Sequence, residues 1–162
     1  MNLSKILKNT FLIILLSMVV SACATKKTAT NLDSQIQGDV YTGTDTVEYL
    51  AKGVPDRVFF ATNETILTTM SRDTLRKQAA WLRENPSVNV VLEGHADERG
   101  TREYNLALGE RRANAAKDYL MTYGVSADRI SVISYGKERP VDSGSNPLSL
   151  SKNRRSVTVK AN

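Results

Sequence analysis

The chain has 162 residues, enough for one domain with short terminal segments, and a formal net charge of +5. Its single cysteine excludes a disulfide within the chain, so the fold must be stabilised by its core alone. The basic residues form no stripe interleaved with aromatic side chains, which argues against a nucleic-acid-binding surface.

The N-terminal segment has the pattern of a secretory signal peptide. Residues 1–22 carry Lys5 and Lys8 but no acidic residue, and they contain a ten-residue apolar core from Phe11 to Val20. A helix that spans a bilayer needs about 20 apolar residues, so a permanent anchor helix is the weaker interpretation. Without this segment the net charge of the chain falls from +5 to +3.

The apolar core is followed by Val20-Ser21-Ala22-Cys23, which resembles the lipobox of bacterial lipoproteins. In such signals the cysteine thiol is acylated, and cleavage then makes the cysteine the first residue. Two or three acyl chains anchor a protein stably, because each buried methylene contributes about 0.8 kcal/mol. We expect Cys23 to be lipidated; the alternative is an unmodified cysteine in an ordinary signal peptide.

Residues 23–44 are expected to form a flexible tether that starts at the lipidated Cys23. They are rich in Thr, Lys, Ser, Gln, Gly and Asp, and show neither a helical nor a strand period. About 22 residues reach roughly 75 Å when extended and average about 25 Å as a coil. The predicted domain follows from residue 45 to residue 162.

The domain is expected to have the element order β-α-β-α-β-β. Hydrophobic periodicity and end signals, including Asn85-Pro86, the cap Thr101 and the stop Gly124, define these elements. The predicted strands span 57–60, 88–93, 130–135 and 156–160, the helices span 71–85 and 101–123, and 136–147 is a loop. Strands that alternate with amphipathic helices favour an α/β sandwich, in which helices pack on a sheet.

The segment from Glu93 to Gly100 is where chemistry is most expected. If it is extended, Glu93, His95 and Asp97 lie on one side, which favours a hydrolase as the alternative function. A zinc site would need more ligands, because the chain has one histidine and no spare cysteine. A serine nucleophile is not indicated either, since no serine occupies a strand-to-helix turn near His95. The glycines match no phosphate-cradling or dinucleotide motif, so no metal or cofactor is expected and His95 is interpreted as structural.

The second predicted helix carries a charge on its packed face. Arg112 and Asn105 lie in or beside a stripe formed by Leu106, Gly109, Ala113, Ala116, Leu120 and Tyr123. A guanidinium there needs an anionic partner. Asp97 could form an internal ion pair with Arg112, or the two charges could grip the carboxylate and ammonium of a zwitterionic ligand.

Four segments resemble the C-terminal domain shared by OmpA-like proteins: 94–105, 108–114, 134–140 and 151–155. The resemblance covers about residues 56–160. It implies a mixed sheet with helices on one face, and non-covalent, non-catalytic binding of peptidoglycan at the diaminopimelate of its stem peptide. In that family the residues matching Asp97 and Arg112 contact the diaminopimelate, and the positions of Arg99, Thr101, Asn105 and Leu108 line the same pocket.

The resemblance also implies a place in the cell envelope. Lipid-anchored members of the family connect the outer membrane to the cell wall, bind the periplasmic propeller protein TolB and take part in cell division within the Tol system. Ala24 is not the aspartate that retains lipoproteins at the inner membrane, so we expect an outer-membrane protein whose domain faces the periplasm. Asn63 stands where the family commonly has an aspartate near the ligand, and it can offer hydrogen bonds but no charge.

Overall fold

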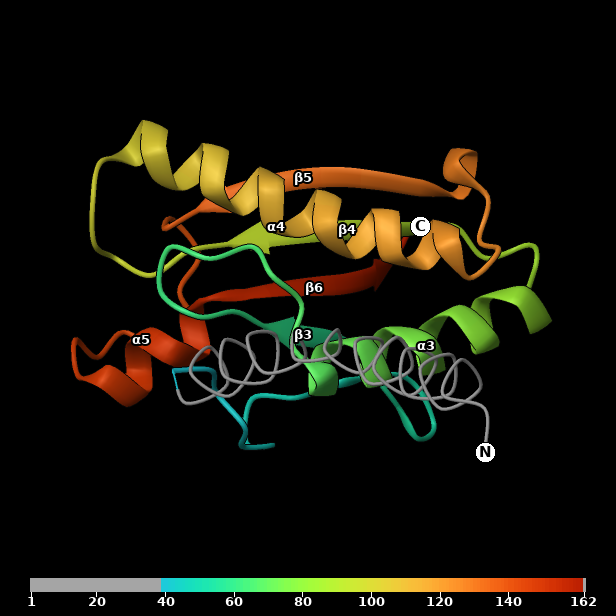
Figure 1. The fold of residues 1–162 in the computed structure, drawn as a ribbon, viewed down its shortest axis with the longest axis horizontal. Helices are drawn as coiled ribbons and strands as arrows, with labels where there is room; N and C mark the ends of the chain where they lie inside the picture. The colour runs from blue at the N-terminus through green and yellow to red at the C-terminus, as the bar shows by residue number, and fades with distance from the viewer. Residues whose placement is uncertain (1–38, 162) are drawn as a thin grey trace, which may run out of the picture. The chain divides into compact units, whose positions relative to one another are not determined.

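The computed structural model describes residues 39–161 (Figure 1). The predicted signal peptide, Cys23 and residues 24–38 of the predicted tether lie outside the described residues. Within residues 39–161, no helix combines the length and the apolar composition that a membrane span requires.

A four-stranded mixed sheet forms the centre of the domain. Its strands are β3 (Arg57–Phe59), β6 (Arg155–Lys160), β4 (Val90–His95) and β5 (Ile130–Gly136), in that spatial order. β4 and β5 are parallel, whereas β6 runs antiparallel to both β3 and β4. The predicted class, a mixed sheet with helices packed on it, is confirmed.

Two long helices cover one face of this sheet, the face turned toward the viewer in Figure 1. They are α3 (Thr69–Glu84) and α4 (Arg102–Thr122). Thr68 and Thr101 cap them, each accepting a hydrogen bond from a backbone N–H of the first turn. α4 ends before Gly124, whose φ of 85° reverses the chain at low steric cost.

The hydrophobic core lies between the helices and the sheet. Leu92 in β4 and Leu82 in α3 are fully buried, and burying such a side chain contributes about 1.5–3 kcal/mol. The other buried apolar residues of this cluster are Val58, Phe60, Leu75, Ala79, Val90, Ala113, Ala116, Leu120, Val125 and Ile130. Because α4 supplies small residues at its centre, its backbone approaches the sheet closely.

Four short elements were not expected from the sequence. A hairpin of β1 (Tyr49–Ala51) and β2 (Val54–Pro55) precedes the sheet, and a 3-10 turn leads into β5. The prediction of no helix between the last two strands is wrong, because α5 (Pro147–Asn153) lies there. Asn146 caps α5 and proline occupies its first position, a start signal that the polar loop composition obscured.

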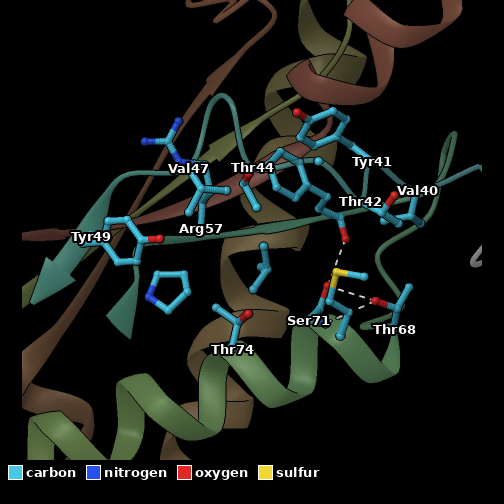
Figure 2. A pocket seen from close by; sticks show the side chains of 15 residues that line it. Val40, Tyr41, Thr42, Thr44, Val47, Tyr49, Arg57, Thr68, Ser71 and Thr74 are labelled. Carbon is cyan, nitrogen blue, oxygen red and sulfur yellow. Dashed lines mark hydrogen bonds between the residues drawn. The ribbon is translucent and has the colours of Figure 1, made fainter. Parts of the chain in front are cut away.

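Residues 39–44 lie against the domain, although they were assigned to the tether. Tyr41 is buried, and its ring meets that of Phe59 edge-on at 4.8 Å between centroids. Burial of this ring and its contact with Phe59 help to hold the segment against the domain. A cavity of about 160 Å³ lies beneath this segment, between Tyr41, the hairpin residue Tyr49 and the start of α3 near Ser71 (Figure 2).

Candidate ligand-binding site

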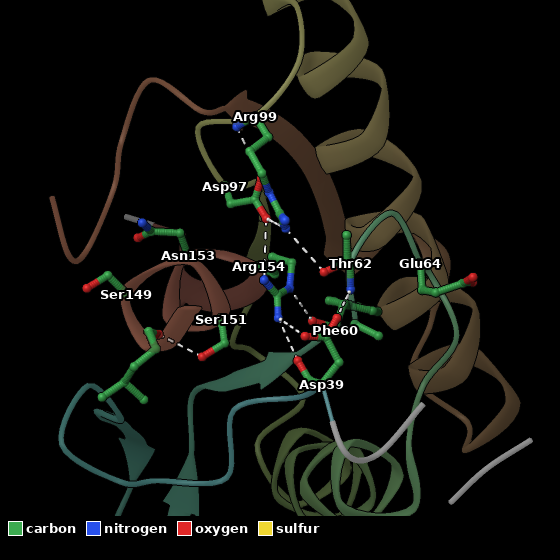
Figure 3. A network of polar contacts seen from close by, with 12 residues as sticks. Asp39, Phe60, Thr62, Glu64, Asp97, Arg99, Ser149, Ser151, Asn153 and Arg154 are labelled. Atoms are coloured by element: carbon green, nitrogen blue, oxygen red, sulfur yellow. Dashed lines mark hydrogen bonds and ion pairs between the residues drawn. The ribbon is translucent and has the colours of Figure 1, made fainter. Parts of the chain in front are cut away.

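Polar side chains converge where β4 ends. The loop 60–64 after β3, the loop 96–101 after β4 and the start of β6 bring their charged groups together there (Figure 3). The network joins residues that are far apart in the sequence: Arg154 donates a hydrogen bond to Asp39, which lies 115 residues earlier. The site is therefore a product of the sheet order, which places β6 between β3 and β4.

Asp97 is the acidic centre of the network. Its Oδ2 accepts hydrogen bonds from Arg99 Nη2 at 2.6 Å and Arg154 Nη1 at 3.4 Å, and its Oδ1 accepts from the Arg99 backbone N–H at 3.2 Å. Burial alone raises the pKa of Asp97, but the hydrogen bonds from Arg99 outweigh it and hold the pKa below its ordinary value. Asp97 is thus ionised at neutral pH.

Arg154 links Asp97 to two other segments. Its side chain is 3% exposed, and besides Asp97 it binds Asp39 Oδ1 at 3.1 Å and donates to the Phe60 carbonyl at 3.0 Å. Asp39 in turn accepts the Thr62 N–H. Arg154 was not among the predicted site residues, although it belongs to the 151–155 motif. It lies between the last residue of α5 and the first residue of β6, in a polar stretch of sequence that gives no sign of burial.

Arg112 is fully buried and is held by backbone carbonyls. Its Nε donates to the Glu64 carbonyl at 3.0 Å, Nη1 to that of His95 at 2.9 Å and Nη2 to that of Ala61 at 3.0 Å. The guanidinium also lies 5.3 Å from the centre of the Phe60 ring. Burial and the nearby charge of Arg154 lower its pKa to about 10, so the cation persists at neutral pH.

The internal ion pair considered for Asp97 and Arg112 does not form between their side chains. Asp97 pairs with Arg99 and Arg154, and no carboxylate within residues 39–161 lies in ion-pair contact with Arg112. The Asp97 charge still favours the Arg112 cation through space. Three of the five N–H donors of Arg112 are used within the described part of the chain, and two remain for another acceptor.

The structure places the other predicted site residues around these two charges in different roles. Thr101 caps α4, and Asn105 donates from Nδ2 to the Arg99 carbonyl at 2.9 Å, which fixes the loop bearing Asp97. Leu108 is buried on the same helix. Asn63 is exposed and has a φ of 57°, a left-handed conformation that asparagine tolerates better than most residues.

The Glu93, His95 and Asp97 cluster is divided by the fold. His95 Nε2 lies 3.7 Å from Glu93 Oε2, whereas Asp97 follows the end of β4 and faces the arginine network. Within residues 39–161, no three side chains of histidine, cysteine, aspartate or glutamate are grouped closely enough to hold a metal ion. The predicted arrangement of all three on one side is therefore wrong.

The mixed sheet with helices on one face defines an α/β domain, and the charged network where β4 ends is its candidate site. Residues 59–154 match the OmpA family. The chain belongs to that family, as its sequence motifs indicated.

Individual relatives agree with this assignment. The chain is 42% identical to the peptidoglycan-associated lipoprotein of Mesorhizobium japonicum over 98% of its own length and 95% of the relative. The crystal structure of the peptidoglycan-associated lipoprotein from Burkholderia pseudomallei has a TM-score of 0.64 and 35% identity, covering 65% of this chain and 90% of that one. The C-terminal domain of Helicobacter pylori MotB, at 19% identity, 66% and 84% coverage and a TM-score of 0.61, shares the fold.

Proposed function

We propose that this chain is an outer-membrane lipoprotein that binds peptidoglycan without catalysing a reaction, and so connects the membrane to the wall. The relatives named peptidoglycan-associated lipoprotein support the class of ligand. The observation that carries the proposal is Arg112, a fully buried guanidinium with two unused donors and no carboxylate partner among the described residues.

The ligand contact is proposed to be the diaminopimelate of the stem peptide. A buried cation without an anionic partner is costly, and a carboxylate from the ligand would offset that cost. Arg112 is therefore assigned to a carboxylate of diaminopimelate. Its position is fixed beforehand by three carbonyls, so little conformational entropy is lost when the ligand binds.

The ammonium end of the ligand is assigned to Asp97. The carboxylate is ionised and partly solvent-facing through Arg99, whose side chain is 50% exposed. Arg99 is the cation that the ligand ammonium replaces on Asp97, while Arg154, 3% exposed, remains in place. Thr101, Asn105 and Leu108 shape the loop and helix around this contact, and Asn63 contributes through its backbone turn.

Sedimentation of the full chain with purified wall sacculi tests the proposal. Arg112→Ala and Asp97→Ala are expected to abolish sedimentation, with Arg111→Ala and Glu98→Ala as exposed neighbouring controls that leave it intact. Free diaminopimelate should displace the protein, whereas lysine, which has the same two ammonium groups but one carboxylate fewer, should displace it poorly. Circular dichroism and thermal melting of each variant separate loss of binding from loss of fold.

Two outcomes would reject the binding site or the function. If folded Arg112→Ala and Asp97→Ala both sediment like the unchanged chain, the proposed clamp is wrong. If sacculi release soluble fragments, and His95→Ala stops the release, the protein is a wall-processing hydrolase instead. The separation of Asp97 from Glu93 and His95 argues against that alternative.

The envelope assignment extends to Cys23 and to a partner. We infer that Cys23 carries the lipid, that the domain faces the periplasm from the outer membrane, and that a TolB-like propeller protein binds it. Radioactive palmitate should label the chain, and Cys23→Ser should remove the label and release the protein from outer-membrane vesicles. Co-purification of TolB from the same vesicles tests the partner independently.

A further inference from the structure

The N-terminal segment contributes a second carboxylate to the candidate site, that of Asp39. Its Oδ1 lies 3.1 Å from Arg154 Nη2, and its Oδ2 accepts the Thr62 backbone N–H at 2.8 Å. Arg154 Nη1 donates to Asp97 at 3.4 Å, so one guanidinium bridges the two carboxylates (Figure 3). Asp39 was assigned to the tether, but its contacts place it in the same network as Asp97.

The Asp39 carboxylate is accessible to a ligand. Its side chain is 53% exposed, whereas that of Asp97 is 9% exposed. Burial raises the pKa of Asp39, but hydrogen bonds from Thr62 and the charge of Arg154 outweigh it and hold the pKa below its ordinary value. Asp39 is therefore ionised at neutral pH. Each oxygen of an ionised carboxylate can accept more than one hydrogen bond, so Asp39 keeps acceptor capacity on its exposed side.

The charges of the network show why one carboxylate does not suffice for a ligand ammonium. The carboxylates of Asp39 and Asp97 meet the guanidiniums of Arg99 and Arg154. Arg154 is 3% exposed and stays in place, whereas Arg99 is 50% exposed and gives way to the ammonium. Arg154 by itself balances Asp97, which leaves that pair with no net charge to offer. With Asp39 added, two carboxylates and one guanidinium carry a net charge of −1, which matches one ammonium.

Two other acidic side chains near the network are less well placed than Asp39. The hydrogen bond to Asp97 contributes most to raising the pKa of Arg99, and the charge of Asp39 contributes more than that of Glu98. The side chain of Glu64 points away from the network in Figure 3. Among the described residues, Asp39 is therefore the carboxylate that, after Asp97, acts most strongly on the place that the Arg99 guanidinium occupies.

We propose that Asp39 binds the ligand ammonium together with Asp97, so that the segment before the first strand completes the binding site. The inference rests on the proposed function, because the ammonium is that of diaminopimelate. In the bound state the Arg99 side chain turns toward solvent and the ammonium takes its place beside both carboxylates. Arg154 holds the two carboxylates in position from the buried side, and the neutral Asn63 is not needed as a source of charge.

Isothermal titration calorimetry of the full chain in detergent tests the inference with two ligands. Meso-diaminopimelate carries ammonium groups beside its carboxylates, whereas pimelate has the same carbon chain and both carboxylates but no ammonium. Asp39→Asn is expected to weaken diaminopimelate binding by about fivefold, because it removes the charge of a half-exposed contact. The same variant should not weaken pimelate binding, since pimelate has no ammonium for Asp39 to hold.

Asp45→Asn is the matched control, because Asp45 belongs to the same N-terminal segment but pairs with Lys152 at 2.8 Å. It should bind diaminopimelate like the unchanged chain. Asp39→Glu keeps the charge, should keep most of the affinity, and serves if Asp39→Asn does not fold.

Two results would overturn the inference while the proposed function stands. One is a folded Asp39→Asn that binds diaminopimelate like the unchanged chain. The other is an equal loss of affinity for diaminopimelate and pimelate, which would give Asp39 a structural role only. The proposed function fails, and this inference with it, if Asp97→Ala and Arg112→Ala also bind diaminopimelate like the unchanged chain.

Discussion

A β-carbon placed on Gly109 would lie 2.8 Å from the carbonyl oxygen of Gly94, so α4 and β4 touch backbone to backbone at this point. Gly94 directly precedes His95, whose carbonyl accepts from Arg112. The depth at which α4 sits on the sheet therefore fixes where Arg112 meets its three carbonyls.

Gly109→Ala is expected to destabilise the domain by about 2–3 kcal/mol, because the added methyl group forces α4 away from β4. Sacculus binding should fall as well, since Arg112 moves with the helix. Chemical unfolding followed by circular dichroism measures the first effect. Ala107→Ser, an exposed change on the same helix, should alter the free energy of unfolding by less than about 0.5 kcal/mol. An equal effect of both substitutions would contradict the close approach.

The pH dependence of stability is expected to reflect His95. Burial, followed by the charges of Arg155, Arg139 and Arg57, lowers its pKa from 6.5 to about 3. Below pH 6.5 the unfolded chain takes up a proton that the folded chain refuses until about pH 3. The neutral His95 therefore makes its full contribution to the free energy of unfolding above pH 6.5. Between about pH 6.5 and pH 3, each unit by which the pH falls lowers that free energy by about 1.4 kcal/mol.

The single histidine allows a direct measurement of that pKa. Its ring carbon signals should not titrate between pH 7 and pH 4 in the folded chain. In His95→Gln the slope of unfolding free energy against pH should fall by about one proton over the same interval. A His95 signal that titrates near pH 6.5 would show that the ring is hydrated or paired.

Arg99→Ala should tighten the binding of free diaminopimelate by about two- to fivefold, because a half-exposed ion pair of about 0.5–1 kcal/mol no longer competes with the ligand ammonium. Isothermal titration calorimetry measures the dissociation constant. Glu98→Ala is the matched control from the same loop and should not change it. Weaker binding of Arg99→Ala would mean that Arg99 holds the ligand instead of giving way to it.

Asn63→Val should destabilise the domain by about 1–2 kcal/mol, since a β-branched residue is strained at a φ of 57°. Asn63→Gly should keep both stability and sacculus binding if the role of Asn63 is to shape the loop 60–64. Melting temperatures and sedimentation of the two variants check this. A folded Asn63→Gly that no longer sediments would assign a direct ligand contact to the amide.

Hydrophobic periodicity and end signals predicted the long helices, which show both, but missed the short elements, which show no period. The helices 71–85 and 101–123 were placed within two residues of α3 and α4 at each end, because hydrophobic periodicity coincides there with end signals: Asn85-Pro86 for the first helix, Thr101 and Gly124 for the second. The β1–β2 hairpin and α5 are too short for a period to develop. Tyr41 showed no pattern at all, because its burial depends on Phe59, which is distant in the sequence.

The sequence predicted several of the charged residues that the candidate site contains, but not which groups they form hydrogen bonds with. The helical wheel placed Arg112 on a packed face, and the structure confirms that it is buried. The wheel could not show that the partners are carbonyls of Ala61 and Glu64, which approach only through the tertiary fold. Arg154 was missed for the same reason, since its neighbours Asp39 and Asp97 come from remote segments.

The contact between Asp39 and Arg154 has a mechanical consequence. Asp39 precedes every helix and strand of residues 39–161, so tension along the chain passes through Asp39 before it reaches β3. Asp39 accepts hydrogen bonds from Thr62 and Arg154, and the same Arg154 guanidinium also holds Asp97. Tension on the chain at Asp39 is therefore expected to be transmitted through Arg154 to Asp97, the acidic half of the proposed site.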